Sequence, residues 1–346
     1  MRTRKKPKRI ALLISLMCAA GCSWAQDIHF SQFFEAPLLR NPSLAGIYTG
    51  DIRVQGVYRD QWNSVTNAYR TGSVNAEYKM PVGKGDDFIT AGLQLLYDKA
   101  GTIGLSTTHV LPALNYHKSL SDQKVMYLSL GFMGGMIRKS LDLAKMTTND
   151  QYGPGGFDPT LPNGELINSP NFTTWDASVG MSFNTVFGEG GRNSMFLGLA
   201  YHHLNRPKNS FYKDPNVELQ PKWVGSAGVK LEVDDYSFFT IQADQSVQGS
   251  FSETIAGTLY GYKFGDDPDN PEYIIHGGAF LRLKDALIPV IKLERHPLSI
   301  AISYDVNVSQ LKTASQGRGG FELSLCWIGF LDRGSAARDQ VLCPKF

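Results

Sequence analysis

Long apolar runs are missing from this chain of 346 residues. The one apolar run, residues 10–20, is far shorter than the roughly 20 residues that cross a bilayer as a helix. The chain also lacks a phosphate-binding P-loop, a dinucleotide fingerprint and a G-x-S-x-G nucleophile motif. These absences argue against α-helical membrane proteins and against common enzyme classes, so we expect no enzyme, no catalytic residues and no cofactor.

The amino end has the features of a secretory signal peptide. Residues 2–9 carry six Lys and Arg, the apolar run follows, and small residues fill most of 21–25. This order predicts export and cleavage between Ala25 and Gln26. The alternative is a lipoprotein acylated at Cys22, which is disfavoured because Ala19 stands where a leucine is usual.

Cysteine and net charge are both scarce once residues 1–25 are removed. The six basic residues leave without any acidic ones, so 28 Lys and Arg face 32 Asp and Glu, and no basic patch indicates nucleic acid. Only Cys326 and Cys343 remain. In an oxidising compartment they form either a disulfide or two separate thiols, and their spacing does not decide between these.

What the chain has in abundance is apolar–polar alternation. Residues 298–308 alternate Leu, Ile, Tyr and Val with Ser, Ala, Asp and Asn. Period two predicts a strand between two different environments, and a length of about eleven residues fits a tilted membrane-spanning strand. Charged residues on the polar stripes of other segments favour a water-filled lumen over a dry sandwich core.

About fourteen such segments predict an all-β fold, a transmembrane antiparallel β-barrel. They are residues 51–61, 68–79, 87–98, 106–117, 124–138, 172–186, 192–204, 222–233, 236–247, 252–264, 272–283, 287–295, 298–308 and 319–330. Successive connections between antiparallel strands lie at alternate ends of the barrel. When the connections are numbered along the chain, the long ones are odd-numbered and the even-numbered ones are mostly short, as in outer-membrane barrels with long outer loops and short periplasmic turns. The alternative is a soluble β-rich protein, although no blade-length repeat is present.

Residues 26–50 precede the barrel and cannot form a regular element. Pro37 and Pro42 interrupt any helix or strand, while Phe30 and Phe33 need burial. Either a plug inside the barrel or a strap on its periplasmic side would bury them. The expected organisation is a signal peptide at 1–25, this strap or plug at 26–50, the barrel at 51–330 and a tail at 331–346.

Three further polar features call for an interpretation. His202 and His203 are adjacent on a predicted strand, so they should face opposite sides and share no metal ion. The acidic stretch 265–272 lacks the spacing of a calcium loop and is expected to be a periplasmic turn. The loop at 139–171, rich in Gly and Pro, is long enough to narrow a channel or to contact a substrate.

Five motifs stand out along the chain. It reads HFSQFFEAPLLRNPSLAG at 29–46, VYRDQW at 57–62, HHLNRP at 202–207, GRGGFELSLCW at 317–327 and CPKF at 343–346. Together these motifs resemble the PorP/SprF family of type IX secretion and gliding-motility membrane proteins of Bacteroidota. The residues taken to carry the family motif are His29, Phe30, Ser31, Gln32, Pro37, Asn41, Pro42, Arg59, Gln61 and Trp62. Trp62 and other aromatic residues near strand ends also suit the girdle at a membrane–water boundary.

The resemblance implies a non-enzymatic barrel in the outer membrane, with periplasmic termini and in contact with membrane lipid. It implies as partners the periplasmic ring components of the type IX machinery and a secreted or surface protein with a type-B sorting domain, including gliding adhesins. The alternative function is a porin or solute channel, which an open lumen would permit.

Overall fold

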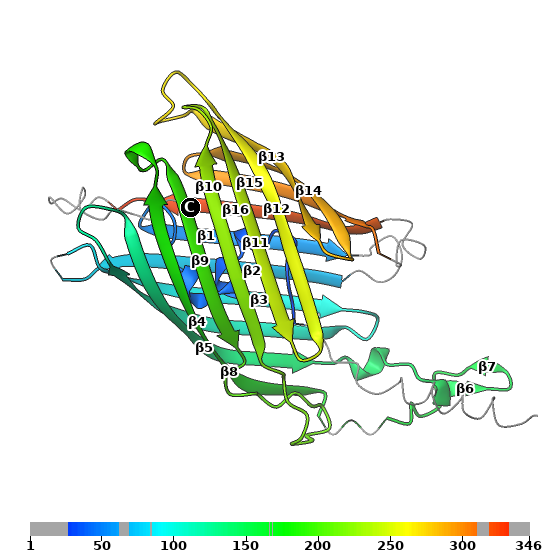
Figure 1. Cartoon of the computed structure of the whole chain (residues 1–346). Coiled ribbons are helices and arrows are strands. Elements are labelled where there is room, and N and C mark those ends of the chain that lie inside the picture. The colour runs from blue at the N-terminus through cyan, green and yellow to red at the C-terminus, as the bar shows by residue number, and fades with distance from the viewer. Residues whose placement is uncertain are drawn as a thin grey trace, which may run out of the picture.

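Fourteen antiparallel strands close into one barrel in the computed structural model (Figure 1), which confirms the predicted all-β fold. The structure describes residues 27–61, 69–83, 85–165, 167, 169–309 and 318–331. The barrel strands are β1 Ile52–Gln61, β2 Tyr69–Pro81, β3 Phe88–Ala100, β4 Leu105–Ser119, β5 Met126–Ser140, β8 Asn171–Phe187, β9 Asn193–His202, β10 Lys222–Glu232, β11 Ser237–Gln248, β12 Phe251–Phe264, β13 Tyr273–Arg282, β14 Ala286–Arg295, β15 Leu298–Asn307 and β16 Arg318–Gly329.

The remaining elements are short. They are η1 Phe33–Glu35, α2 Pro37–Arg40, η2 Pro42–Leu44, η3 Leu143–Lys145, η4 Asn149–Gln151, η5 Glu189–Gly191 and the two-stranded sheet of β6 Tyr152–Gly153 with β7 Gly156–Phe157. Among the described residues, no helix has the length and apolar character needed to cross a membrane.

Strands that follow one another in the chain pair with one another around the barrel. The ring closes where β1 pairs with β16, in a register that sets Ile52 opposite Gly329. A closed sheet leaves no unpaired strand edge, which is the condition for a sheet that faces lipid.

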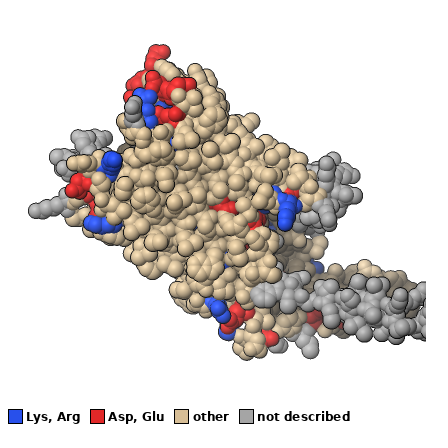
Figure 2. Space-filling model, in the orientation of Figure 1, with Lys and Arg blue, Asp and Glu red and all other residues tan. Residues whose placement is uncertain are grey.

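The alternation read from the sequence separates the two faces of the wall. On β15, Leu298, Ile300 and Ile302 are 40–49% exposed on the outside, whereas Ala301 and Ser303 face inward and are buried. Figure 2 shows that, on the visible face, charged residues gather mainly near the strand ends, with a mostly uncharged surface between them. This is the arrangement expected of a wall in contact with lipid.

The two ends of the barrel differ. One end, which we call the proximal end, holds the start of β1 at Ile52, the end of β16 at Gly329 and the short turn at 296–297. The other, the distal end, holds the long connections 141–170 and 203–221. From the first of these, β6 and β7 form an arm that projects beyond the barrel wall (Figure 1).

Residues 27–50 lie inside the barrel, and we call them the plug. Their apolar side chains pack against inward-facing strand residues, so the hydrophobic core of the molecule lies in the lumen. Phe33, for example, packs against Phe280 with ring centroids 5.3 Å apart. Leu38 packs with Leu111 and Met133 on the opposite wall. Of the two placements left open by the sequence, the geometry is that of a plug.

Candidate functional site

The plug begins at the distal end and runs the length of the lumen. The Lys222 ammonium donates to the Asp27 carboxylate at 3.1 Å, and the Asp27 amide donates to the Gln248 side chain at 3.1 Å. At the other end of the plug, the Gly46 amide donates to Glu77 at 2.7 Å, near the proximal end. Asp27 and Gly329 therefore lie at opposite ends of the barrel, whereas the sequence predicted both ends of the chain on the periplasmic side.

Both adjacent histidines turn toward the plug near the distal end, contrary to the prediction that they face opposite sides. His202 ends β9 and its Nε2 lies 3.0 Å from the Arg40 carbonyl oxygen. His203 has a φ of +59°, which takes it out of the strand geometry and turns its ring inward as well. Its Nδ1 lies 3.0 Å from Asp176 and its Nε2 lies 3.4 Å from Asp27.

These neighbours make His203 a pH-sensitive contact of the plug. Burial by itself would lower the pKa of His203, but hydrogen bonds to Asp176 and Asp27, together with their charges, raise this pKa to about 9. The folded pKa thus exceeds the unfolded value of about 6.5. The stabilisation from protonated His203 is therefore complete below about pH 6.5 and is lost as the pH rises through about 9.

We predict that raising the pH from about 7 to about 10 loosens the distal start of the plug. Cleavage of the plug by subtilisin, followed by mass spectrometry, should then become faster across this range. The matched control is His203→Asn, because asparagine tolerates positive φ but does not titrate. An identical pH dependence in both proteins would show that His203 is not the responsible group.

The family-motif residues Ser31 and Gln32 share one carboxylate of the wall. Glu322 on β16 is fully buried and accepts hydrogen bonds from the backbone amides of Ser31 and Gln32, both at 2.7 Å. The Arg59 Nε lies 3.2 Å from the same carboxylate. A buried carboxylate that accepts a backbone hydrogen bond on each oxygen and lies beside a guanidinium is a strong anchor.

Arg59 connects the motif at 29–46 with that at 57–62. Its guanidinium donates to the His29 carbonyl oxygen at 2.7 Å and to Asp305 at 3.1 Å. The Ser31 hydroxyl donates to Asp305 at 2.8 Å. The structure thus brings His29, Ser31 and Arg59 together in one buried network on the lumen side of β1, β15 and β16.

The other motif residues shape the plug backbone. Pro37 occupies the first turn of α2, where its missing amide hydrogen costs nothing. The Asn41 side chain accepts from the Ser43 amide at 2.9 Å and so caps η2, which begins at Pro42. Phe30 is buried between the plug and the wall. Gln61 ends β1 at the distal end, and Trp62 lies outside the described residues.

A buried ion pair that the sequence did not reveal holds the middle of the plug. Arg40 donates from Nε to Asp244 on β11 at 2.7 Å, and its Nη2 lies 2.5 Å from the other oxygen of the same carboxylate. Both side chains are less than a tenth exposed. In the sequence, basic partners inside the lumen were indicated only by single acidic residues at inward-facing strand positions, such as Asp244 and Glu322.

Glycines on the wall admit the plug at its closest approach. At Gly131 on β5, a Cβ atom would lie 2.5 Å from the Pro42 carbonyl carbon and 2.5 Å from the Ser43 nitrogen. At Gly180 on β8, a Cβ atom would overlap the Asn41 side chain. Only glycine leaves room for η2 at these two positions.

Gly131→Ala is therefore expected to destabilise the protein by about 1–3 kcal/mol, the usual cost of overpacking a core. The clash is with plug backbone rather than with a flexible side chain, so local relaxation is limited. The measurement is the free energy of unfolding in urea. Gly72→Ala on β2 is the matched control, because no atom lies within 4 Å of the added carbon. Equal effects of the two substitutions would contradict the close approach.

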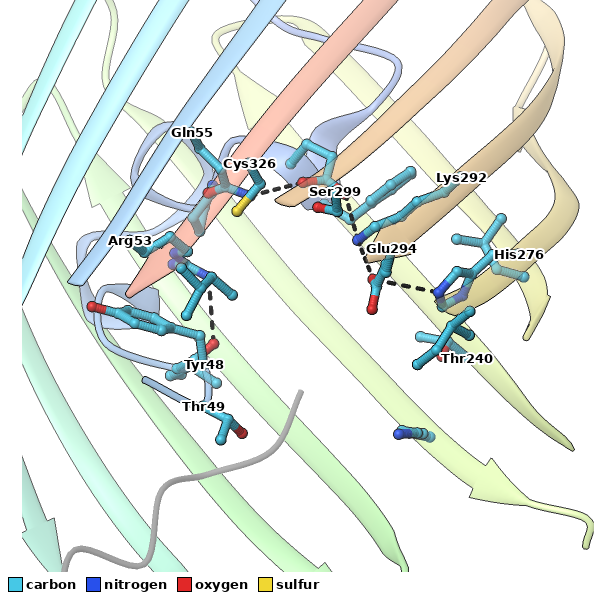
Figure 3. Close-up of a pocket in the computed structure, with 18 of the residues that line it drawn as sticks. Tyr48, Thr49, Arg53, Gln55, Thr240, His276, Lys292, Glu294, Ser299 and Cys326 are labelled. Atoms are coloured by element: carbon cyan, nitrogen blue, oxygen red, sulfur yellow. Dashed lines mark hydrogen bonds and ion pairs between the residues drawn. The ribbon is translucent and has the colours of Figure 1, made fainter. Parts of the chain in front are cut away.

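The plug leaves one sizeable cavity in the described part of the lumen, about 450 Å³ and open at the proximal end. It lies between η1, α2 and the wall from β9 to β16. Figure 3 shows Lys292, Glu294 and His276 linked in a row along one side, with Arg53, Gln55 and Cys326 on the other. Its aromatic walls include Phe34, Tyr48 and Phe238.

Two cations of the cavity, Lys292 and Arg53, are each paired with carboxylates. Lys292 Nζ lies 2.8 Å from Glu35 on the plug and 2.9 Å from Glu294 on its own strand. Arg53 pairs with Glu77 at 2.7 Å. Within the described ranges, no three His, Cys, Asp or Glu side chains are grouped to hold a metal ion.

Some of the residues singled out in the sequence cannot be placed. Ala25, Gln26 and Cys343 lie outside the described residues. Cys326 is a buried thiol on the inner face of β16.

Comparison with solved structures finds distant matches of low sequence identity. The chain resembles the toluene transporter TbuX of Ralstonia pickettii with 10% identity and a TM-score of 0.49, covering 90% of this chain and 96% of that one. For a Pseudomonas aeruginosa FadL homologue the identity is 12% and the TM-score 0.45, with 85% and 94% covered. For CdiB from Acinetobacter baumannii the identity is 8% and the TM-score 0.41, with 80% of this chain but only 60% of that chain covered.

Sequence comparison is more specific. No curated protein matches the chain significantly. Residues 23–327, however, match the family described as type IX secretion system membrane protein PorP/SprF. This match contains the motifs at 29–46, 57–62 and 202–207 and confirms the resemblance drawn from them. The chain therefore belongs to the PorP/SprF family of type IX secretion system membrane proteins.

Proposed function

We propose that this outer-membrane protein is a non-enzymatic component of the type IX secretion and gliding machinery, which anchors periplasmic components and supports export or surface attachment of partner proteins. In this proposal the signal peptide directs export, and the proximal end faces the periplasm. The barrel acts through contact with other proteins and with lipid rather than as a solute channel.

The observation that carries the proposal is the filled lumen. The plug crosses it from end to end and is held by the Glu322 carboxylate on β16 and the Asp244 carboxylate on β11. A porin needs a continuous water path, and apolar clusters around Phe33 and Leu38 occupy that space. The solute-channel alternative consequently has less support than an anchoring role.

The distal arm offers a surface for a partner. Gln151 organises it, since its backbone oxygen accepts from the Asp158 amide at 2.8 Å and its side-chain amide donates to the Leu161 carbonyl at 3.0 Å. Tyr152 and Phe157 form an aromatic pair there and are 64% and 43% exposed. An ordered loop that holds aromatic rings in solvent is typical of a protein-binding surface.

The test is removal of the gene, followed by mass spectrometry of the culture medium and of the cell surface. We expect loss of a secreted or surface protein with a type-B sorting domain, and its return on complementation. Complementation with Tyr152→Ser plus Phe157→Ser should restore less than the wild type. Leu197→Ala, which alters an exposed residue on the outer face of β9, is the control. An unchanged set of exported proteins after gene removal would refute the proposed role.

A further inference from the structure

Three basic side chains lie on the lipid-facing side of the wall at the distal end. They are Arg70 on β2, Lys99 on β3 and Arg138 on β5, and we call them the outer cations. Each falls on an exposed position in the alternation of its strand, so each points away from the lumen. Strands β8 to β15 carry no Lys or Arg on the outer face of their distal halves. The outer cations therefore mark one sector of the barrel.

The outer cations lie at the border of the apolar band. The outward-facing residues of 89–97 on β3 and of 128–136 on β5 are uncharged, and the next outward positions are Lys99 and Arg138. From the first residue of each stripe to its cation is ten residues, 89 to 99 and 128 to 138. Ten residues rise about 33 Å along a strand, or about 25 Å across a membrane at a tilt of about 40°. This is the height of the apolar band of such barrels, so the cations lie at the level of the lipid headgroups.

The strand register brings the outer cations close together. Arg70 lies directly opposite Lys99 in the pairing of β2 with β3. One strand, β4, separates β3 from β5, and the Cα atoms of Lys99 and Arg138 are about 12 Å apart at the usual strand spacing and rise. The long side chains of Lys and Arg can close this distance around a single anion.

Two of the outer cations have no carboxylate partner. Arg70 Nε lies 3.4 Å from Asp60 on β1, but Lys99 and Arg138 form no ion pair and no side-chain hydrogen bond within the part of the chain that the structure describes. Asp142, which follows β5, pairs with Lys145 at 2.8 Å. Like charges opposite one another on adjacent strands destabilise a sheet, so Lys99 beside Arg70 favours a bound anion.

Exposed aromatic rings lie next to the outer cations, on the membrane side. Tyr97, two residues before Lys99, is 51% exposed. Trp175 on β8 pairs with Met136, two residues before Arg138, and is 67% exposed. Aromatic rings at this depth are typical of the headgroup boundary. A ligand that fits this surface therefore has an anionic head beside the cations and an apolar body beside the stripes of β3 to β5.

We propose that the outer cations bind a phosphate group of lipid A, the acylated glycolipid of the outer leaflet. The Arg138 guanidinium holds the phosphate through two parallel hydrogen bonds, Lys99 adds a point charge, and the acyl chains lie against the apolar stripes of β3 to β5. The choice of the outer leaflet rests on the proposed orientation of the barrel, with the proximal end in the periplasm. The binding test below does not depend on secretion, so the two proposals can fail separately.

The test is titration of the full-length barrel, freed of lipid in a neutral detergent, with diphosphoryl lipid A, followed by native mass spectrometry. The variant Lys99→Gln plus Arg138→Gln should bind at least about tenfold more weakly than the wild type, which corresponds to about 1.4 kcal/mol. Lys118→Gln is the matched control, because Lys118 is an outward-facing cation, 57% exposed, at the proximal end of β4. It should bind as the wild type does. Equal affinities of the wild type and the double variant, both folded by heat-dependent gel migration, would overturn the proposal.

Three further titrations of the wild type identify the group that is recognised. Lipid A from which the phosphates have been removed should bind as weakly as diphosphoryl lipid A binds to the double variant. Inorganic phosphate in large excess should not displace lipid A, and phosphatidylglycerol should bind more weakly than lipid A. Equal binding of the dephosphorylated lipid, displacement by inorganic phosphate, or equal binding of phosphatidylglycerol would each overturn the assignment to phosphorylated glycolipid.

Discussion

Deletion of residues 27–46 is expected to convert an electrically silent barrel into one that conducts ions. These residues include η1, α2 and η2, which occupy the lumen. The wall left behind presents polar side chains such as Asn75, Ser129 and Asp244, so water can enter once the plug is gone. The measurement is single-channel recording in planar bilayers, where the wild type should give no steps and the deletion variant discrete ones.

The deletion variant must be shown to contain a folded barrel. Heat-dependent migration in gel electrophoresis shows this, because a closed barrel resists unfolding by detergent at room temperature. The control is a deletion of comparable size in the distal arm, residues 149–163, which leaves the plug in place and should remain silent. Conductance by the wild type, or silence of a folded deletion variant, would mean that the plug does not block the lumen.

Arg40→Ala should be the most destabilising single substitution in the plug, at about 3–5 kcal/mol of unfolding free energy. The substitution leaves Asp244 charged and unpaired in a site where it is only 8% exposed. It also removes a cation held 4.6 Å from the centre of the Phe33 ring. Unfolding in urea from lipid vesicles, followed by tryptophan fluorescence, measures the loss.

A double-mutant cycle separates the ion pair from other losses. Asp244→Ala alone leaves Arg40 buried without its partner, so the double variant should cost less than the sum of the two single ones. Arg70→Ala is the surface control, because Arg70 is 59% exposed and lies 3.4 Å from Asp60, and such exposed pairs contribute about 0–1 kcal/mol. Additive effects of Arg40→Ala and Asp244→Ala would argue against a coupled buried pair.

The strands could be predicted because the alternation of apolar and polar residues in each strand reflects the two environments of that strand alone. Residues 298–308 alternate since lipid lies on one side of β15 and the lumen on the other, and the observed strand is Leu298–Asn307. The same reasoning predicted the strand number. It did not predict that His203 turns inward, because a single positive φ at the end of β9 leaves no trace in a pattern of period two.

The position of the plug could not be predicted from local sequence patterns. The sequence indicated that Pro37 and Pro42 break regular structure and that the phenylalanines need burial, but a strap outside the lumen would bury the same side chains. The residues that decide between them are far away in the chain. Asp244 is 204 positions from Arg40, and Glu322 is 291 positions from Ser31.

The sequence by itself determined an exported all-β chain whose alternating strands close into a barrel, because side-chain period and connection length depend on near neighbours. Its motifs also determined the family. Only the tertiary structure decided what fills the lumen. The placement of the plug depends on charged side chains and on the space left by glycines, and these come from strands that lie around one lumen only after the barrel has closed. Gly131, Asp244 and Glu322 look ordinary in the strands that carry them, and they acquire a role through the plug that they hold.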